Sequence, residues 1–407
     1  MNKTRRAFLG TSAAVAAHVW IPRPVKGYTA EEIVPVTPQR AGISKWELDT
    51  PALCVDLDKL ERNIAKMQRT CNANKIAVRP HAKTHKCAAI AKMQMAAGAI
   101  GICTAKLSEA EALLAEGVDK ILMTTSNLPP AKIRKAMDLK KRYPGFIQAV
   151  DWDQNARDLQ DAAKAAGVVA DVVIDVAVGT RSGIPPGEDA INLARLVDKQ
   201  PNLKLRGMLS YDGGAQHINT FAERKARTLK NIEENARTYE KMKAGGLNTE
   251  IFSGGGTGTY NIYHEVPGFT DVQVGSYIFM DMQYIVIGNA DGQPVYDDFE
   301  PSLTVLATVV NNRFPGRLTT DAGAKALTIN VPRAGVIGEP GMDYNAGSDE
   351  FGSITFKEAR KEWKMGEKME LIIPHCDPAV NLYDYIYAIR NDRVEAVWEV
   401  TARGHSQ

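Results

Sequence analysis

Segments typical of β-strands alternate with segments typical of amphipathic helices between residues 75 and 278, and this alternation limits the possible folds more than any other feature. The helical stretches, such as LSEAEALLAEG, carry apolar residues at helical spacing and end at glycine. Eight such units in about 200 residues predict a TIM (β/α)8 barrel, which is an α/β fold. A doubly wound sheet is the alternative, but no G-x-G-x-x-G motif opens a helix after the first strand. The predicted strands are 75–83, 100–105, 119–125, 146–151, 170–177, 203–211, 249–256 and 270–278.

From about residue 300 onward, the sequence consists of short β-branched runs separated by turn residues, among them SLTVLATVVNNR, KMELIIPH and RVEAVWEVTARG. Such runs are typical of strands in a mainly β domain. We therefore expect the barrel domain to occupy residues 45–285 and a C-terminal β domain to occupy residues 286–407. A strand near 50–57 precedes the barrel and is a candidate to join that β domain.

The composition argues against two kinds of partner. The chain has 50 basic and 48 acidic residues, a formal net charge of +2 and no basic stripe, which argues against nucleic acid. No apolar run reaches the roughly 20 residues that a helix needs to cross a bilayer, so we expect no integral membrane segment. The five cysteines lack CxxC spacing, and we expect buried core residues rather than a disulfide framework.

Residues 1–30 have the features of an export signal. The stretch TRRAFLG places Arg5 and Arg6 ahead of a modest apolar run, in the pattern of twin-arginine signals. This interpretation predicts a periplasmic protein that is exported in the folded state. A disordered basic tail is the alternative, and a cytoplasmic location would then be expected.

The stretch RPHAKTHK, residues 79–86, gathers several basic groups at the end of the first predicted strand. If the strand continues through it, Arg79, His81, Lys83 and His85 share one face. Basic neighbours and burial would both lower the pKa of the Lys83 amine. A neutral amine is what covalent chemistry with an aldehyde requires. The alternative is a surface lysine that extends its amine into water.

The glycine run in SGGGTGTY, residues 253–260, ends the seventh predicted strand, at the edge of a TIM barrel where chemistry takes place. Its bare backbone amides, at Gly255, Gly256 and Thr257, can close around an anion such as phosphate. A flexible glycine turn is the alternative. A phosphate cradle opposite a reactive lysine indicates pyridoxal phosphate as the cofactor.

Three stretches together resemble the D-threonine aldolase and D-serine dehydratase family: TPALCVDLDKLERNI (50–64), RPHAKTHK and SGGGTGTY. These pyridoxal-phosphate enzymes have a barrel similar to that of alanine racemase, and the resemblance covers nearly the whole chain after about residue 45. It implies that Lys83 binds the cofactor covalently, that Arg181 approaches the ring oxygen and that Tyr211 lies near the pyridine ring. It also implies a homodimer. The other cofactor contacts that we expect are His81, Gly255, Gly256, Thr257 and Tyr277.

The stretch IIPHCDPAVNLYD, residues 372–384, is expected to choose the chemistry. A histidine with a cysteine favours zinc, whereas a histidine with an aspartate favours magnesium or manganese. If the segment is extended, His375 and Asp377 point the same way and can bind one metal ion, while Cys376 points away. Pro378 favours an extended Asp377. The family comparison agrees, since the aldolases resemble His-x-Asp and the dehydratases His-x-Cys; a structural turn is the alternative.

These features predict a metal-assisted aldolase. We expect it to cleave D-3-hydroxyamino acids, either D-threonine or 3-hydroxy-D-aspartate, to glycine plus acetaldehyde or glyoxylate. The PHCDPAVNLYD form most resembles the 3-hydroxy-D-aspartate aldolase branch. The alternatives are a D-serine dehydratase, which would release pyruvate and ammonia, and a non-catalytic pyridoxal-phosphate carrier or binding protein.

The base that removes the substrate's hydroxyl proton is the least defined part of this hypothesis. His217, in YDGGAQH, follows the sixth predicted strand and is the first candidate. Many relatives place this histidine directly after a single glycine, whereas this chain has Gly213-Gly214 and places it later. His81 and His85 are second candidates, and a loop histidine without a catalytic role is the alternative for His217.

Overall fold

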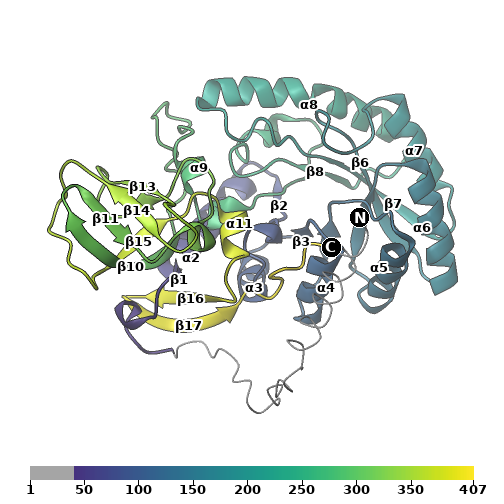
Figure 1. Ribbon diagram of the computed structural model, residues 1–407. Coiled ribbons are helices and arrows are strands. Elements are labelled where there is room, and N and C mark those ends of the chain that lie inside the picture. Colours follow the sequence, from purple (N-terminus) through teal and green to yellow (C-terminus); the bar gives the residue numbers. More distant parts are fainter. Residues whose placement is uncertain (1–40) are drawn as a thin grey trace, which may run out of the picture. The chain divides into compact units, whose positions relative to one another are not determined.

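The computed structural model describes residues 41–407, so the export signal expected over residues 1–30 lies outside the described part of the chain. Eight parallel strands form one sheet in the order β2-β9-β8-β7-β6-β5-β4-β3, and a bridge from His81 to Cys103 joins its two edges. The strands are β2 (Ala77–Val78), β3 (Ile102–Thr104), β4 (Ile121–Met123), β5 (Ile147–Val150), β6 (Ala170–Asp175), β7 (Leu203–Ser210), β8 (Ile251–Gly254) and β9 (Asp271–Val272). Each predicted strand contains one of them, and the predicted TIM-like barrel is confirmed (Figure 1).

Helices between the barrel strands bury one face each, as their periodicity predicts. In α6, for example, Ala156, Leu159 and Ala163 are fully buried at a spacing of three and four residues. The long helix α8 begins at an N-cap, where the Thr220 side chain accepts a hydrogen bond from the Glu223 amide. The helices are α2 (Leu57–Ala73), α3 (Ala88–Ala96), α4 (Leu107–Ala115), α5 (Pro130–Arg142), α6 (Asp153–Ala166), α7 (Glu188–Asp198) and α8 (Phe221–Ala244).

A second, nine-stranded sheet has the order β11-β14-β13-β12-β15-β10-β1-β16-β17 (Figure 1). Strand β10 also pairs with β11, so six of these strands close into a small barrel. Most neighbours in this sheet are antiparallel, as expected for a mainly β domain. The strands are β1 (Ala52–Asp56), β10 (Leu303–Phe314), β11 (Arg317–Thr320), β12 (Gly335–Val336), β13 (Asp343–Asn345), β14 (Gly352–Thr355), β15 (Lys368–Ile372), β16 (Tyr385–Arg390) and β17 (Arg393–Glu399).

Strand β1 ties the beginning of the described chain to its end. It pairs antiparallel with β10 and parallel with β16, and the chain then enters the first barrel helix α2. The barrel strands are therefore inserted between two neighbouring strands of the second sheet. Within residues 41–407, none of the helices has the length and apolar character that crossing a bilayer requires.

Short helical segments complete the fold, and five of them position parts of the site; the other two in residues 41–407 are η1 (Lys45–Glu47) and α10 (Ala324–Leu327). Two of these five, η2 and α11, pack against each other, although one follows a barrel strand and the other lies in the C-terminal part of the chain. These segments are η2 (Ala82–Thr84), η3 (Tyr263–Glu265), η4 (Ser276–Ile278), α9 (Met282–Ile285) and α11 (Cys376–Val380).

Candidate active site at the carboxyl ends of the barrel strands

A cavity of about 600 Å³ opens where the eight barrel strands end. Every strand or the loop after it contributes side chains, which is the arrangement that active sites in TIM barrels share. Six of the residues expected to bind the cofactor or to react line this cavity, namely His81, Lys83, Arg181, Tyr211, Gly256 and Thr257.

The basic stretch after β2 does not continue the strand. Strand β2 ends at Val78, and Lys83 lies in the 3-10 turn η2, where the His81 ring accepts a hydrogen bond from the Lys83 amide at 3.4 Å. The prediction that the four basic groups share one face is therefore wrong. Arg79 instead donates to the buried Asp271 carboxylate at 2.9 Å, and His85 is buried with its Nδ1 accepting from the Cys87 amide.

The charge of Lys83 also differs from the expectation. Its Nζ forms an ion pair with the Asp377 carboxylate of α11. Burial lowers the pKa of Lys83, but Asp377 raises it by more, so the amine is held protonated before any aldehyde reaches it. The prediction of a depressed lysine pKa is wrong because it considered only groups near in sequence. Burial and the Lys83 charge both lower the pKa of His81, so a neutral ring lines the cavity beside Lys83.

The expected metal-binding segment is not extended. His375 caps α11, and Asp377 lies in the first turn of this short helix, so the expectation based on strand alternation and Pro378 is wrong. The buried Asp281 carboxylate accepts from His375 Nδ1 and from the Cys376 amide, both at 2.9 Å. Burial lowers the pKa of His375, and Asp281 raises it by more.

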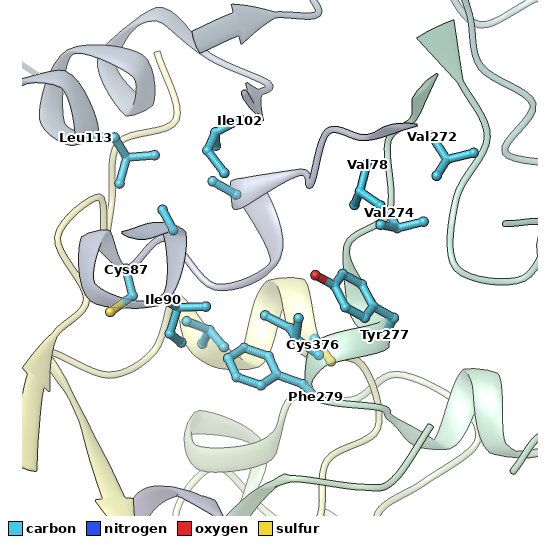
Figure 2. Close-up of a cluster of buried hydrophobic side chains, with 14 of the residues drawn as sticks. Val78, Cys87, Ile90, Ile102, Leu113, Val272, Val274, Tyr277, Phe279 and Cys376 are labelled. Atoms are coloured by element: carbon cyan, nitrogen blue, oxygen red, sulfur yellow. The ribbon is translucent and has the colours of Figure 1, made fainter. Parts of the chain in front are cut away.

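The Cys376 thiol faces away from the cavity. Its side chain is 0 % exposed and belongs to the apolar cluster that contains Tyr277 and Phe279 (Figure 2). Burial raises its pKa well above the usual value for a thiol, and a thiolate is the form that binds zinc. The geometry therefore disfavours a His–Cys zinc site here.

His375 and Asp377 have the features of a pair of metal ligands. The Asp377 Oδ1 atom is buried without a hydrogen-bond partner. Burial alone would raise the pKa of the Asp377 carboxyl group, but the charges of Lys83 and His375 outweigh burial and hold this pKa at about 2. Asp281 binds His375 Nδ1, which leaves Nε2 as the ring nitrogen available to a metal ion. Within residues 41–407, no group of three or more His, Cys, Asp or Glu side chains is placed so that it could hold a metal ion.

The glycine loop after β8 is shaped by close packing. Gly255 has φ of +66°, and a Cβ atom there would lie 2.8 Å from the Tyr263 ring. At Gly256, a Cβ atom would lie 2.7 Å from the Gln216 side-chain oxygen. The loop thus presents backbone where a side chain would not fit. The Thr257 hydroxyl accepts from the Tyr277 amide at 3.0 Å, which leaves its proton free to be donated into the cavity.

The Tyr277 side chain points away from the cavity. Its hydroxyl accepts a hydrogen bond from the Gln94 side-chain amide at 3.0 Å, and its ring packs near Phe299 in the core. Its contribution to the loop is the backbone amide that binds Thr257. Gly255 lies next to the cavity but, like Tyr277, is not among the residues that line it.

Arg181 and Tyr211 meet at the ends of β6 and β7. The Arg181 guanidinium carbon lies 4.8 Å from the centre of the Tyr211 ring, in a cation–π contact. Both side chains line the cavity, so a cofactor ring could bind beside them.

His217 lies near the candidate metal ligands rather than in the cavity lining. Its ring centre is 4.5 Å from that of Tyr284, which does line the cavity. Burial lowers the pKa of His217. The Asp281 carboxylate offsets part of this effect, and the charge of His375 adds to it. The imidazole is therefore held neutral on the side of the cavity where α11 docks.

Sequence reasoning missed two acids in the cavity wall. Asp151 and Asp175 follow apolar segments, at the ends of β5 and β6, and an acid at the end of an apolar strand was the available signal. Ser126 donates to Asp151 at 2.8 Å. Burial, together with the charge of Asp151, raises the pKa of Asp175 to about 6. Sequence reasoning also missed Asp281, because it is remote from His375 in sequence and contacts it only in the folded chain.

Comparison with known proteins shows similarity over nearly the whole chain. The family described as "Alanine racemase, N-terminal domain" matches residues 55–283, and the family described as "Putative serine dehydratase domain" matches residues 302–389. A 3-hydroxy-D-aspartate aldolase of Paracoccus denitrificans is 34% identical over 93% of this chain and 97% of its own length. A D-threonine aldolase of an Arthrobacter species is 34% identical over 91% and 97%. The crystal structure of D-threonine aldolase from Filomicrobium marinum superimposes with a TM-score of 0.86 at 35% identity, covering 91% of this chain and 100% of that one.

Proposed function

Because this chain belongs to the alanine-racemase-like family of pyridoxal-phosphate-dependent lyases, we propose that it is a metal-assisted aldolase of D-3-hydroxyamino acids. One observation carries this proposal: the candidate cofactor lysine, Lys83, meets the candidate metal ligand, Asp377, in one ion pair. A candidate cofactor-binding group, which lines the cavity, and a candidate metal-binding group from a distant part of the chain are thereby brought into contact. Aldol cleavage uses both.

Bound pyridoxal phosphate supplies an electron-withdrawing ring that makes bonds to the substrate's amino-bearing carbon easier to break. In this chain, Lys83 would bind its aldehyde, and the loop of Gly255, Gly256 and Thr257 would bind its phosphate, with Thr257 donating from its amide and its hydroxyl. The Gly256 amide itself donates to the Thr259 hydroxyl at 3.2 Å. The neutral His81 ring and the Arg181–Tyr211 pair would flank the cofactor ring. Tyr277 would act through its backbone amide only.

A bound divalent ion supplies Lewis acidity that lowers the pKa of a hydroxyl group next to it. We propose that His375 and Asp377 hold this ion and that it is magnesium or manganese. The buried Cys376 thiol and the acidic Asp377 carboxylate support this choice over zinc. Asp281 would orient His375 by holding its Nδ1.

His217 would take the proton from the substrate's 3-hydroxyl group. Its lowered pKa keeps the ring nitrogen unprotonated at neutral pH, as a general base requires. Its position beside Asp281 and Tyr284 supports this role, since both belong to the part of the site where α11 docks.

The substrates of the two relatives named above define the experiment. D-threonine, 3-hydroxy-D-aspartate and D-serine are supplied separately to the full chain loaded with pyridoxal phosphate, with magnesium or with manganese. Release of glycine together with acetaldehyde or glyoxylate supports the aldolase. Pyruvate from D-serine alone, without glycine from the other two, would instead make the protein a dehydratase. A chelator should stop the aldolase and added metal should restore it.

Two further proposals rest on the sequence. We propose a homodimer, which sedimentation of the loaded protein would test. We also propose export by the twin-arginine route, and cell fractionation of strains with and without Arg5→Lys and Arg6→Lys would test it. Accumulation in the cytoplasm of both strains would contradict export.

A further inference from the structure

Helix α8 carries a buried arginine that forms no ion pair, although the charge of Asp298 acts on it. Arg224 is 0 % exposed, and within the part of the chain that the structure describes it forms no ion pair. Burial lowers its pKa, yet a guanidinium stays ionised in proteins. Burial of a charge that forms no ion pair is costly, and an apolar side chain in the same place would avoid the cost. Arg224 therefore requires an explanation other than packing.

The guanidinium joins three chain segments through backbone carbonyls. Nε donates to the Gly258 carbonyl at 2.7 Å, and Nη1 donates to the carbonyls of Ile218 at 2.7 Å and Ile287 at 2.9 Å. Nη2 donates to the Gly288 carbonyl at 3.0 Å. Each segment lies next to a part of the site: the glycine loop, the loop that carries His217, and the end of α9.

The glycine loop is held from the same side by a second group. The Tyr296 hydroxyl donates to the Thr257 carbonyl at 2.7 Å, and the Tyr296 ring centre lies 5.5 Å from the Arg224 guanidinium carbon. Gln216 accepts from the Gly258 amide at 3.0 Å. The carbonyls of residues 257 and 258 are therefore bound behind the loop, away from the cavity that Thr257 lines.

We propose that Arg224 is a positioning residue for the cofactor's phosphate, which rests on the proposed role of the glycine loop in binding pyridoxal phosphate. By holding the Gly258 carbonyl, it helps to keep the carbonyls of residues 257 and 258 turned away from the anion, so that Thr257 can face it with its amide and hydroxyl. Its charge also favours an anion on the other side of the loop, where screening by water is weak. Arg224 acts through the loop and does not touch the ligand.

The test compares two ligands that differ only in the phosphate. Dissociation constants for pyridoxal phosphate and for pyridoxal are measured by absorbance on the cofactor-free full chain, for wild type, Arg224→Met and Arg224→Lys. Arg237→Met, at an exposed position of the same helix, is the matched control. For Arg224→Met we expect a loss of affinity on the order of ten- to a hundredfold for pyridoxal phosphate, as for other outer-shell groups, and an unchanged affinity for pyridoxal. Arg224→Lys keeps the charge but can form fewer hydrogen bonds, so its loss of affinity for pyridoxal phosphate should be smaller than that of Arg224→Met.

An equal loss of affinity for both ligands in the Arg224 variants would overturn the inference, because it would indicate a general structural role. Circular dichroism shows whether each variant folds. If Arg224→Met does not fold, the same two affinities are measured for Arg224→Lys and for Tyr296→Phe, which lacks one hydrogen bond to the loop. A larger loss for pyridoxal phosphate than for pyridoxal then supports the inference, and an equal loss overturns it. If wild type binds neither ligand, the proposed function fails and not this inference alone.

Discussion

The two sides of the cavity are built in different ways. The phosphate side presents backbone, and its shape comes from glycines packed against Tyr263 and Gln216. The lysine side presents charged side chains, and its Lys83–Asp377 ion pair joins a barrel turn to a helix of the C-terminal part of the chain. The backbone of the phosphate side is suited to binding one fixed group. The charges on the lysine side depend on which side chains the C-terminal part of the chain brings next to Lys83. The proposed function would thereby assign cofactor binding and the choice of reaction to separate parts of the site.

Removing the lysine should give the largest effect. Lys83→Ala is expected to lower kcat roughly a thousandfold or more, because it removes the only group proposed to bind the cofactor covalently. The absorbance band of the lysine-bound cofactor should be lost, together with its sensitivity to borohydride. Lys106→Ala is the matched control, since Lys106 lines the same cavity from the end of β3. A borohydride-sensitive band that survives in Lys83→Ala would contradict the assignment.

Loss of the candidate metal ligand Asp377 should affect turnover but not cofactor binding, and so distinguish the roles of the two sides. Asp377→Asn is expected to lower kcat/KM about a hundredfold or more, because a Lewis acid contributes several kcal/mol to the transition state. The cofactor should still bind, since the phosphate side is unchanged, and its absorbance provides that measurement. Asp384→Asn, at an exposed position near α11, serves as control. Full activity of Asp377→Asn with the same metal dependence would show that the ion lies elsewhere.

The buried carboxyl group of Asp175, in the cavity wall, should make the stability of the protein depend on pH. The pKa of Asp175 is raised from 3.8 to about 6, so its folded state binds a proton more tightly than its unfolded state. Its contribution to stability is complete below pH about 4 and is lost as the pH rises through about 6. Relative to wild type, Asp175→Asn should therefore gain about 2 kcal/mol in free energy of unfolding between pH 4 and pH 7.

Urea denaturation of the cofactor-free chain at the two pH values measures this difference. Asp161→Asn, at an exposed position of α6, should show no comparable gain. A difference between Asp175→Asn and wild type that stays constant from pH 4 to pH 7 would mean that the carboxyl titrates normally.

The smallest effect is expected on the phosphate side. Tyr277→Phe removes the acceptor for the Gln94 side chain and should cost about 1–2 kcal/mol of stability. Affinity for pyridoxal phosphate should not change, because the backbone amide that binds Thr257 remains. A selective loss of affinity for pyridoxal phosphate over pyridoxal would show that the hydroxyl, and not the backbone, acts on the phosphate.

Sequence patterns located the strands well and the charged contacts poorly. The eight barrel strands follow from local periodicity, which each segment carries by itself. The glycine loop was equally visible, since a run of glycines marks exposed backbone. Strand alternation failed at Lys83 and at Asp377 because both lie in short helical turns rather than in strands.

Contacts between distant segments were beyond local reasoning. Asp281 and His375 meet only because α9 and α11 are neighbours in the fold. Arg224 stands among the charged residues of an amphipathic helix, and its sequence neighbours give no sign that it is fully buried. The pKa of Lys83 was misjudged for the same reason, since its strongest partner, Asp377, is remote in sequence.

The pairing of β1 with β16 has a consequence for the order of biosynthesis. Cys54 pairs with Tyr387, so β1 leaves the ribosome long before its partner is made. At about 5–20 residues per second, the delay is roughly 20 s to a minute. During this interval Lys83 also lacks Asp377, which emerges shortly before β16. The nascent barrel therefore waits with β1, an interior strand of the second sheet, unpaired on the side of β16, and Lys83 gains its Asp377 partner only once translation is nearly finished.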